Sequence, residues 1–335
     1  MTKSIKDQLN QIATGTELHT GSLYIFSKMN RESLSIFRSV WPTIPTQRRR
    51  DVMQELVQIG EVNFEVYFDP VFLLGLADED AEVRASAING LWEHEDPALI
   101  GPLVHLLRTD EAAIVRAAAA TALGQFIYMG EVEDIDQHQA LLAEEALLDT
   151  IHQGAEDIEV QRRAIESIAY SSEPAVVQII ENAYYDEDEK MQASAIFAMG
   201  RSADLSWRPQ VIAELENDNS EIRFEAARAC GELEAGDAIP KLVEIVEEDP
   251  DLQVQEMALW ALGRIGGPVA QEALEEYLES DVEAIALAAE EALDELNLFN
   301  DSLELLDFED DDDDSDEWFD VGDSNGLDRR GGYLH

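Results

Sequence analysis

The segment DEAAIVRAAAATALG (110–124) decides the fold of this chain. Three other segments resemble it closely, namely EVRASAINGL (82–91), EIRFEAARAC (221–230) and QVQEMALWAL (253–262). With weaker copies included, eight equivalent apolar anchors follow one another: Val52, Val83, Val115, Val160, Met191, Ile222, Val254 and Ile285. Their spacings are 31, 32, 45, 31, 31, 32 and 31 residues, so the chain is a repeat array with one enlarged interval.

Each repeat holds two helical patterns. The anchor helix has apolar or small residues at offsets 0, +4 and +7 or +8 from its anchor, which is one face of a 3.6-residue period. Offset +4 is alanine in seven copies, so neighbouring helices are expected to approach closely there. A second amphipathic segment precedes each following anchor helix, as in 98–107 and 238–246. Stacked helix pairs predict an all-α solenoid of about eight two-helix repeats, almost free of strands.

Two sets of residues are expected at the ends of the anchor helices. An aspartate in the preceding turn can cap free backbone N–H groups. Glycine after the last apolar position is typical of a left-handed helix end. The expected caps are Asp110, Asp157, Asp218 and Asp249, and the expected left-handed glycines are Gly124, Gly200, Gly231 and Gly263.

The chain divides into three zones by pattern and charge. Residues 1–45 are predicted to form an N-terminal helical cap, and residues 46–297 the solenoid, with a loop insertion near 128–139. Residues 298–335 lose all periodicity and predict an acidic, disordered tail. The net charge of −51 is uneven, at +5 over residues 1–50, −44 over 51–300 and −12 over 301–335.

The charge and composition exclude several classes of protein. A body carrying −44 would be repelled by nucleic-acid phosphates and by anionic membranes. The single cysteine, Cys230, excludes an intrachain disulfide and a multi-cysteine zinc site. No signal-peptide pattern begins the chain, and no apolar run approaches the roughly 20 residues of a membrane span. The expected compartment is the cytoplasm.

The pattern in 110–124 resembles the HEAT repeat, and more narrowly the short variety named after phycobilisome lyases. The resemblance covers about residues 45–297 and implies that the anchor helices line the concave face. It also implies a ladder of Asp–Arg pairs between repeats. Arg84, Arg116 and Arg223 match that ladder, whereas glutamine stands at 161, 192 and 255.

Some proteins of this fold are enzymes, so we compare the positions of their metal ligands and catalytic motifs with this sequence. Deoxyhypusine hydroxylase is similar in fold and binds two irons through His-Glu pairs directly after the Val-Arg of its repeats. The equivalent positions here are Ala85, Ala117, Arg162, Ala193, Phe224, Glu256 and Leu287, which predicts no metal site. His94-Glu95 lies in a connecting segment, and Cys230 occupies an apolar offset typical of a buried thiol. Phosphate-loop, nucleotide-binding and hydrolase motifs are missing from the sequence, so no catalytic residue is assigned.

Offsets +3, +6 and +10 of the anchor helices lie off the buried face and predict the lining of the concave groove. They include basic and aromatic residues, which are common anchors in binding sites. The predicted groove residues are Arg163, Tyr170, Phe197, Arg201, Arg228, Trp260 and Arg264. Alternatively, the arginines bridge neighbouring helices and Trp260 is partly core.

The acidic tail contains bulky apolar residues that could form a short binding motif: Leu305, Phe308, Trp318 and Phe319. One hypothesis is that the tail docks in its own groove and competes with a partner. The alternative is a solubilising extension.

These patterns predict a non-catalytic scaffold that binds a protein or peptide along the concave face, without a cofactor. The groove is expected to accept acidic or aromatic residues, and the outer surface basic partners. The protein is expected to bind neither nucleic acid nor a membrane, and it is expected to be a monomer. Two alternatives stay open. One is an enzyme-associated role like that of phycobilin lyases, on a modified or chromophore-bearing protein, and the other a nucleic-acid mimic or binder.

Overall fold

The computed structural model describes residues 5–15, 18–27, 29–154 and 156–310, and over residues 299–310 it describes the helix but not the side chains. All regular structure in this part of the chain is helical. The anchor helices form one layer: α3 (Thr46–Val62), α5 (Ala81–Asn89), α7 (Ala113–Glu131), α9 (Ile158–Ile168), α11 (Glu189–Arg201), α13 (Ser220–Glu232), α15 (Leu252–Ile265) and α17 (Glu283–Asp310). Their partners form a second layer: α4 (Asp69–Gly75), α6 (Ile100–Thr109), α8 (Gln137–Gln153), α10 (Ala175–Tyr184), α12 (Arg208–Glu214), α14 (Ile239–Glu248) and α16 (Gly267–Tyr277).

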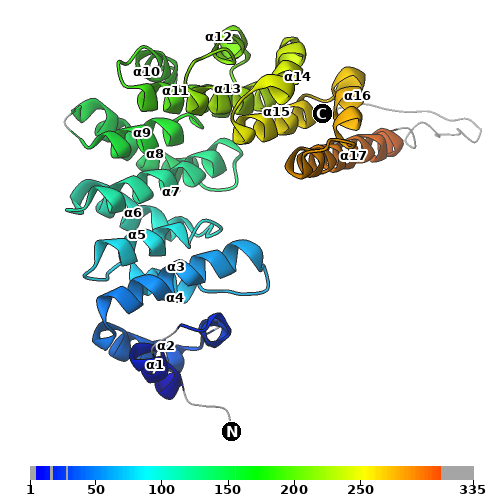
Figure 1. The fold of residues 1–335 in the computed structure, drawn as a ribbon. Coiled ribbons are helices and arrows are strands. Elements are labelled where there is room, and N and C mark those ends of the chain that lie inside the picture. The colour runs from blue at the N-terminus through cyan, green and yellow to red at the C-terminus, as the bar shows by residue number, and fades with distance from the viewer. Residues whose placement is uncertain (1–4, 16–17, 28, 155, 311–335) are drawn as a thin grey trace, which may run out of the picture.

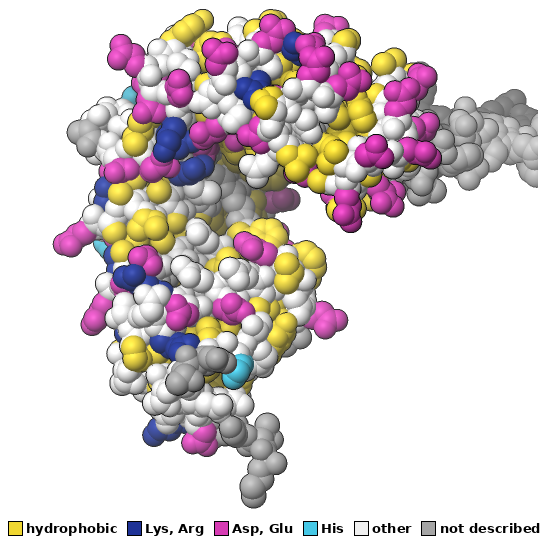
Figure 2. Space-filling model, in the orientation of Figure 1, with side chains coloured by type: hydrophobic (Ala, Val, Ile, Leu, Met, Phe, Trp, Pro, Cys, Tyr) yellow, Lys and Arg dark blue, Asp and Glu magenta, His cyan; other side chains and the backbone are white. Residues whose placement is uncertain are grey.

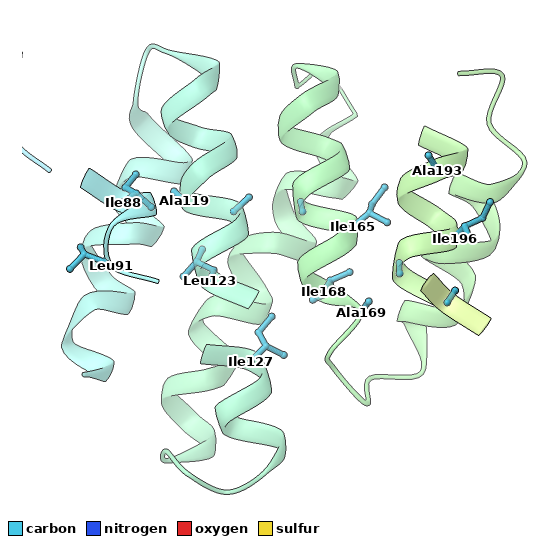
Figure 3. Packing of buried hydrophobic residues seen from close by; sticks show 14 of the residues in the cluster. Ile88, Leu91, Ala119, Leu123, Ile127, Ile165, Ile168, Ala169, Ala193 and Ile196 are labelled. Carbon is cyan, nitrogen blue, oxygen red and sulfur yellow. The ribbon is translucent and has the colours of Figure 1, made fainter. Parts of the chain in front are cut away.

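The helix pairs stack into a crescent (Figure 1). Each anchor helix packs against the next anchor helix, from α3 through to α17, and each from α5 onward also packs against the partner helix that precedes it. The buried side chains form one continuous cluster along the whole stack, part of which is drawn in Figure 3. The prediction of an all-α solenoid of two-helix repeats is therefore confirmed.

The alanines at offset +4 lie at the centre of the anchor-helix layer. Each of them is fully buried: Ala87, Ala119, Ala164, Ala195, Ala226, Ala258 and Ala289. Larger apolar residues such as Leu123 and Ile168 surround them (Figure 3). Small side chains at a fixed offset let the helix backbones approach closely, as the sequence predicts.

The glycines at the ends of the anchor helices do not take left-handed conformations, and that prediction is wrong. Gly200, Gly231 and Gly263 lie inside α11, α13 and α15, where the next anchor helix leaves no room for a side chain. A Cβ on Gly231 would lie 2.9 Å from Cα of Ala261, and one on Gly263 would lie 2.8 Å from the carbonyl oxygen of Ala292. Glycine is therefore used here for close packing.

The left-handed turn comes three residues later. Positive φ angles occur at Glu133, Ala203, Glu234 and Gly266, each three residues after a glycine. Only one of these four residues is glycine, so the turn is imposed by the packing on both sides of it rather than by residue type.

Short polar side chains cap several anchor helices. Asp80, Asp157, Asp188, Asn219 and Asp251 accept hydrogen bonds from the first backbone N–H groups of α5, α9, α11, α13 and α15. Of the four predicted caps, only Asp157 has this role. Asp110 and Asp249 lie two residues before the cap position and accept from Ala112 N and Asp251 N, both at 2.9 Å. Asp218 caps no helix in the described structure.

A ladder of ion pairs connects the turns of successive repeats. Arg84 contacts Asp110 through two hydrogen bonds of 2.8 Å, and Arg223 contacts Asp249 through bonds of 2.6 and 2.9 Å. Two further rungs are Arg116–Glu156 at 2.6 Å and Arg49–Asp78 at 3.1 Å. We call these four pairs the inter-repeat ladder. Arg49 lies before its anchor rather than after it, so the sequence pattern missed it.

Glutamine replaces arginine in three repeats, and in two of them it keeps one of the arginine's contacts within the turn. Arg84 and Arg223 also donate to a carbonyl six residues earlier in their own turn, both at 2.8 Å. Gln192 and Gln255 keep that bond, to Asp186 O at 2.7 Å and Asp249 O at 2.6 Å. What glutamine loses is the pair with the next repeat.

The enlarged repeat was expected to contain a loop near 128–139, and the structure differs. Helix α7 continues to Glu131 and α8 begins at Gln137, so most of the extra residues lengthen two helices. Met129 is buried and Tyr128 is half exposed, which places this additional turn of α7 within the packed layer. Helix α7 has the length and apolar composition of a possible membrane span, but it packs between α5 and α9.

The N-terminal region covers the first end of the stack. It comprises α1 (Ile5–Thr14), the 3₁₀ segment Thr20–Phe26, α2 (Arg31–Val40) and the 3₁₀ segment Trp41–Thr43. Phe37 packs edge-on against Phe26 and stacks on Trp41 at 4.8 Å between ring centroids. Helix α2 contacts α4, so apolar surface of the first repeat is covered.

The predicted tail falls largely outside this description. Residues 311–335, including Trp318 and Phe319, lie outside the described residues, and Leu305 and Phe308 belong to α17 without described side chains.

Candidate functional site

The concave face carries three hollows, each lined mainly by anchor helices. The first, of about 600 Å³, lies over α3, α5 and α7, and the third, of about 450 Å³, lies over α13, α15 and α17. The second, of about 570 Å³, lies between them over α5, α7, α9 and α11. Figure 2 shows the hollowed side of the crescent and the dense acidic side chains of its C-terminal arm.

The central hollow gathers four aromatic side chains around an arginine. We call this the aromatic pocket and define it by Trp92, Tyr128, Tyr170, Phe197 and Arg201. Trp92 is 48% exposed and Tyr128 is 50% exposed, so both present ring surface to a ligand. The rings of Tyr128 and Tyr170 meet edge to face, with centroids 5.7 Å apart. Residues from four consecutive repeats thus converge on one site.

Two guanidinium groups stack on the aromatic floor of the pocket. Cζ of Arg201 lies 5.3 Å from the ring centroid of Phe197 and 5.9 Å from that of Tyr170. Arg228 lies closer, at 3.8 Å from the centroid of Phe197. Because a cation is attracted to the face of an aromatic ring, these contacts fix the orientation of Phe197.

The groove arginines are paired with carboxylates of the same chain. Glu232 accepts from Arg228 at 2.5 Å and lies 3.2 Å from Arg201, while Glu225 accepts from Arg228 at 2.7 Å. One nitrogen of Arg228, Nη2, and one oxygen of Glu232, Oε2, are buried without a hydrogen-bond partner in the described structure. The arginine and glutamate charges beneath the pocket therefore offset one another, although these two buried atoms have no hydrogen-bond partner in the described structure.

A second buried group adjoins the first. Glu166 is 7% exposed and accepts from Ser194 Oγ at 2.7 Å and from Arg163 at 2.5 Å. Arg162 donates to Ser194 Oγ at 2.9 Å, so the two neighbouring anchor helices α9 and α11 share one hydrogen-bond network. Burial raises the pKa of Glu225, with the charge of Arg228 opposing and the charges of Glu166 and Glu232 adding to the rise.

The predicted groove residues are placed in different parts of the concave side. Tyr170, Phe197 and Arg201 meet in the aromatic pocket, whereas Arg163 lines the first hollow and Trp260 the third. Arg228 is only 8% exposed and lies beneath Phe197. Arg264 is exposed and paired with Glu295 at 3.4 Å. Arg201 and Arg264 each pair with a carboxylate on the next anchor helix, which agrees with the alternative that the arginines bridge neighbouring helices.

Two aromatic residues of the pocket were missed from the sequence. Tyr128 lies at offset +13, one turn beyond the offset +10 that was read, in a segment interpreted as a loop. Extending the helical period by one turn would have found it. Trp92 follows the end of α5, where the period no longer applies, and no sequence signal marked it.

The residues present do not fit a di-iron centre of the kind that the family resemblance implies. At the expected ligand positions, Ala85 and Ala193 are buried alanines and Arg162 is a buried arginine. His94 is paired with Asp69 at 2.7 Å in the turn after α5. Within the described residues, no three His, Cys, Asp or Glu side chains are grouped so that they could hold a metal.

Curated relatives nevertheless contradict the expectation of a non-catalytic scaffold. Deoxyhypusine hydroxylase of Candida albicans is 30% identical over 131 residues, which cover 38% of this chain and 38% of that enzyme. Deoxyhypusine hydroxylase of Saccharomyces cerevisiae is 29% identical over 115 residues, covering 32% and 35%. The chain thus matches little more than a third of the length of these relatives. Because they are enzymes, the predictions of a scaffold and of no enzymatic role are corrected.

The sequence also matches the family model described as HEAT repeats, over residues 70–146 and 208–294. Among solved structures, the CpcE–CpcF complex of phycocyanin lyase from a Nostoc species has a TM-score of 0.44 and 18% identity, covering 68% of this chain and 94% of that chain. Human deoxyhypusine hydroxylase has a TM-score of 0.36 and 15% identity, covering 88% and 96%. Similarities at this level indicate nothing about activity. The repeats, their two-helix geometry and the family match together identify the chain as a HEAT-repeat protein.

Proposed function

We propose that this protein takes part in an enzymatic reaction on another protein, and that it holds a segment of that protein along its concave face. The observation that carries the proposal is the aromatic pocket, in which four aromatic side chains from successive repeats converge on an open hollow. The enzymatic part is supported by the curated relatives, whose names describe an enzyme.

The pocket favours an aromatic side chain of the bound segment over an acidic one. Arg201 and Arg228 already contact carboxylates, so a ligand carboxylate would have to displace Glu232 or compete with it. Residues 51–300, which contain the pocket, also carry −44, which opposes the approach of an acidic segment. An aromatic ring meets neither obstacle, and it can pack edge to face with Trp92 and Tyr128, each contact contributing about 1 kcal/mol.

The outer surface favours basic partners. Acidic side chains are dense over the C-terminal arm (Figure 2), and such a field accelerates the approach of oppositely charged proteins. We place the protein in the cytoplasm, where a lone thiol such as Cys230 stays reduced.

The reaction is not assigned to iron, because the expected ligand positions do not fit a di-iron centre. No catalytic residue is assigned either. Glu225 has a raised pKa, which suits a general acid or base, but it lies beneath the pocket rather than among its lining residues.

Binding is tested with a short peptide that carries one tryptophan, against the same peptide with alanine in its place. Substitution of Trp92 by alanine should weaken binding of the tryptophan peptide at least 5-fold, measured by calorimetry, because one wall of the pocket is removed. The matched control is Tyr185→Ala, which removes an aromatic side chain that is 74% exposed and outside the pocket. Equal affinity for the two peptides, or equal loss in both variants, would refute the pocket.

The enzymatic part has a separate test. A protein captured by the wild-type chain is incubated with wild-type or Trp92→Ala chain, and its intact mass is followed. A deoxyhypusine-bearing protein with added iron(II) is one arm, since the relatives carry that name. A mass change that depends on Trp92 is expected in the captured protein. Binding with no change of mass in any arm would overturn the enzymatic role and leave the binding site standing.

A further inference from the structure

The N-terminal region carries a second candidate binding surface, which is separate from the concave face. Helices α2 and α4 enclose a hollow of about 450 Å³. We call it the cap groove, and its lining residues are Arg31, Leu34, Ser35, Arg38, Pro70, Leu73 and Leu74. None of them is acidic, in a chain with 73 acidic and 22 basic residues. The cap groove is therefore both basic and apolar.

The two arginines of the cap groove differ from those of the concave face. Both are exposed, and neither contacts a carboxylate among the described residues. The arginines of the ladder and of the concave face are paired, as in Arg223–Asp249 and Arg228–Glu232. A free guanidinium can accept an incoming carboxylate without breaking an existing pair.

The floor of the cap groove offers apolar contact beside these charges. Leu73 is 41% exposed, although it belongs to a helix packed against the core. A neighbouring hollow shares Arg38, Leu73 and Leu74 and continues to Trp41. Asp78 in that hollow is already paired with Arg49 and with the indole N–H of Trp41, while Glu79 is exposed at its rim. Within these two hollows, the arginines without a carboxylate partner among the described residues are therefore Arg31 and Arg38, and both line the cap groove.

The chain itself contains a segment with the complementary chemistry. Seven of the ten residues 311–320 are acidic, and two others are Trp318 and Phe319. This segment directly follows α17, which lies at the opposite end of the crescent from α2 (Figure 1). An acidic segment with bulky apolar residues matches the cap groove in both charge and apolar character.

We propose that residues 311–320 of one copy bind the cap groove of a second copy. Carboxylates pair with Arg31 and Arg38, and Trp318 or Phe319 packs on Leu73. The concave face is a poorer site for this segment, because its arginines are already paired. A contact between opposite ends of two molecules is heterologous, so it joins copies head to tail and differs from the expected monomer.

The proposal is tested by sedimentation velocity on the full chain over a range of concentrations. At low ionic strength the mean mass should rise with concentration, and at about 0.5 M salt it should fall to that of a monomer, because exposed ion pairs are screened. Deletion of 311–335 and the double variant Arg31→Glu/Arg38→Glu should each abolish the rise. The matched control, Arg108→Glu/Lys190→Glu, makes the same change of net charge elsewhere and should keep it.

A binding measurement in trans separates this proposal from other uses of the tail. A labelled peptide of residues 309–322 is titrated into the tail-deleted chain and followed by anisotropy. The Arg31→Glu/Arg38→Glu variant should bind the peptide at least 10-fold more weakly, and the control variant should bind it normally. A constant monomer mass, or equal peptide binding by both variants, would overturn the proposal. So would tail contact that is independent of protein concentration, since that places the segment on its own molecule.

Discussion

The two ends of the anchor helices hold the stack together in different ways. Where the helices begin, buried arginine–aspartate pairs of the inter-repeat ladder connect some of the turns to the next, as in Arg223–Asp249. Where they end, glycines such as Gly231 let neighbouring helices touch, and the ion pairs that join one anchor helix to the next there, Arg201–Glu232 and Arg264–Glu295, are more exposed. The same residue type therefore contributes unequally according to its burial, and position within the repeat decides which role it has.

The largest effect is expected from breaking the ladder. In Arg223→Ala, the carboxylate of Asp249 would lose its partner while its side chain is only 4% exposed. Removing one member of a buried pair typically costs 3–5 kcal/mol, so we expect a loss of about 3 kcal/mol in the free energy of unfolding. Urea denaturation at pH 7 measures it. A loss below about 1 kcal/mol would show that Asp249 is solvated in spite of its burial.

The same pair should make stability depend on pH. Burial alone would raise the pKa of Asp249, but hydrogen bonds from Arg223 and from the backbone N–H of Asp251, with the charge of Arg223, hold it below its usual range. A lowered folded-state pKa contributes stability above the unfolded value of about 4, and this is lost as the pH falls through the folded value. The difference between wild type and Arg223→Ala should therefore be full at pH 7 and shrink below about pH 4. A difference that stays constant down to pH 2.5 would contradict this account.

At the other end of the helices, contact rather than charge should dominate. In Gly231→Ala the new Cβ would meet Ala261 Cα at 2.9 Å, so α13 and α15 would have to separate. Overpacking of this kind costs about 2 kcal/mol. Gly60→Ala is the matched control, because nothing lies within 4 Å of its added Cβ, and there alanine should stabilise the helix. Urea denaturation of both variants should give opposite signs.

A restored rung should sharpen the comparison by a smaller amount. Gln161 stands at a ladder position, and Asp186 lies two residues before the next helix cap, as Asp249 does in its own repeat. Gln161→Arg should therefore gain about 0.5–1 kcal/mol in the free energy of unfolding. In Gln192→Arg the equivalent partner would be Asn217, so the gain should be smaller. Equal gains would mean that added positive charge, and not the rung, is responsible.

The smallest effect is expected for the exposed pair. Arg264 and Glu295 are 42% and 49% exposed and lie 3.4 Å apart. Arg264→Ala should change the free energy of unfolding by less than about 0.5 kcal/mol in the same urea assay. A loss above 1 kcal/mol would place this pair with the buried ones.

Much of the fold could be predicted from the sequence, because a helical period depends on residue spacing alone. The buried alanines, the two-helix repeat and the ladder arginines Arg84, Arg116 and Arg223 all follow from it. The glycines were misread, since a sequence does not show whether glycine serves a turn or a close contact. The glycine makes the close contact and the positive φ angle comes three residues later, as Gly231 and Glu234 illustrate.

Less of the candidate site could be predicted from the sequence. Tyr170, Phe197 and Arg201 were found because they lie on one face of their helices, whereas Trp92 lies beyond a helix end. Ion pairing of the groove arginines depends on side-chain geometry across repeats, which spacing does not encode. An enzymatic role was not expected from the sequence, since none of the positions compared with the iron ligands of deoxyhypusine hydroxylase holds histidine here.

The burial of the single cysteine makes this protein convenient for spectroscopy. Cys230 is fully buried, and burial raises the pKa of its thiol to about 12, so thiol reagents should leave it untouched in the folded chain. Any cysteine introduced on the surface becomes the sole labelling site. A donor dye near α2 and an acceptor dye near α16 would then report the end-to-end distance of the crescent in solution, with no need to remove a native thiol first.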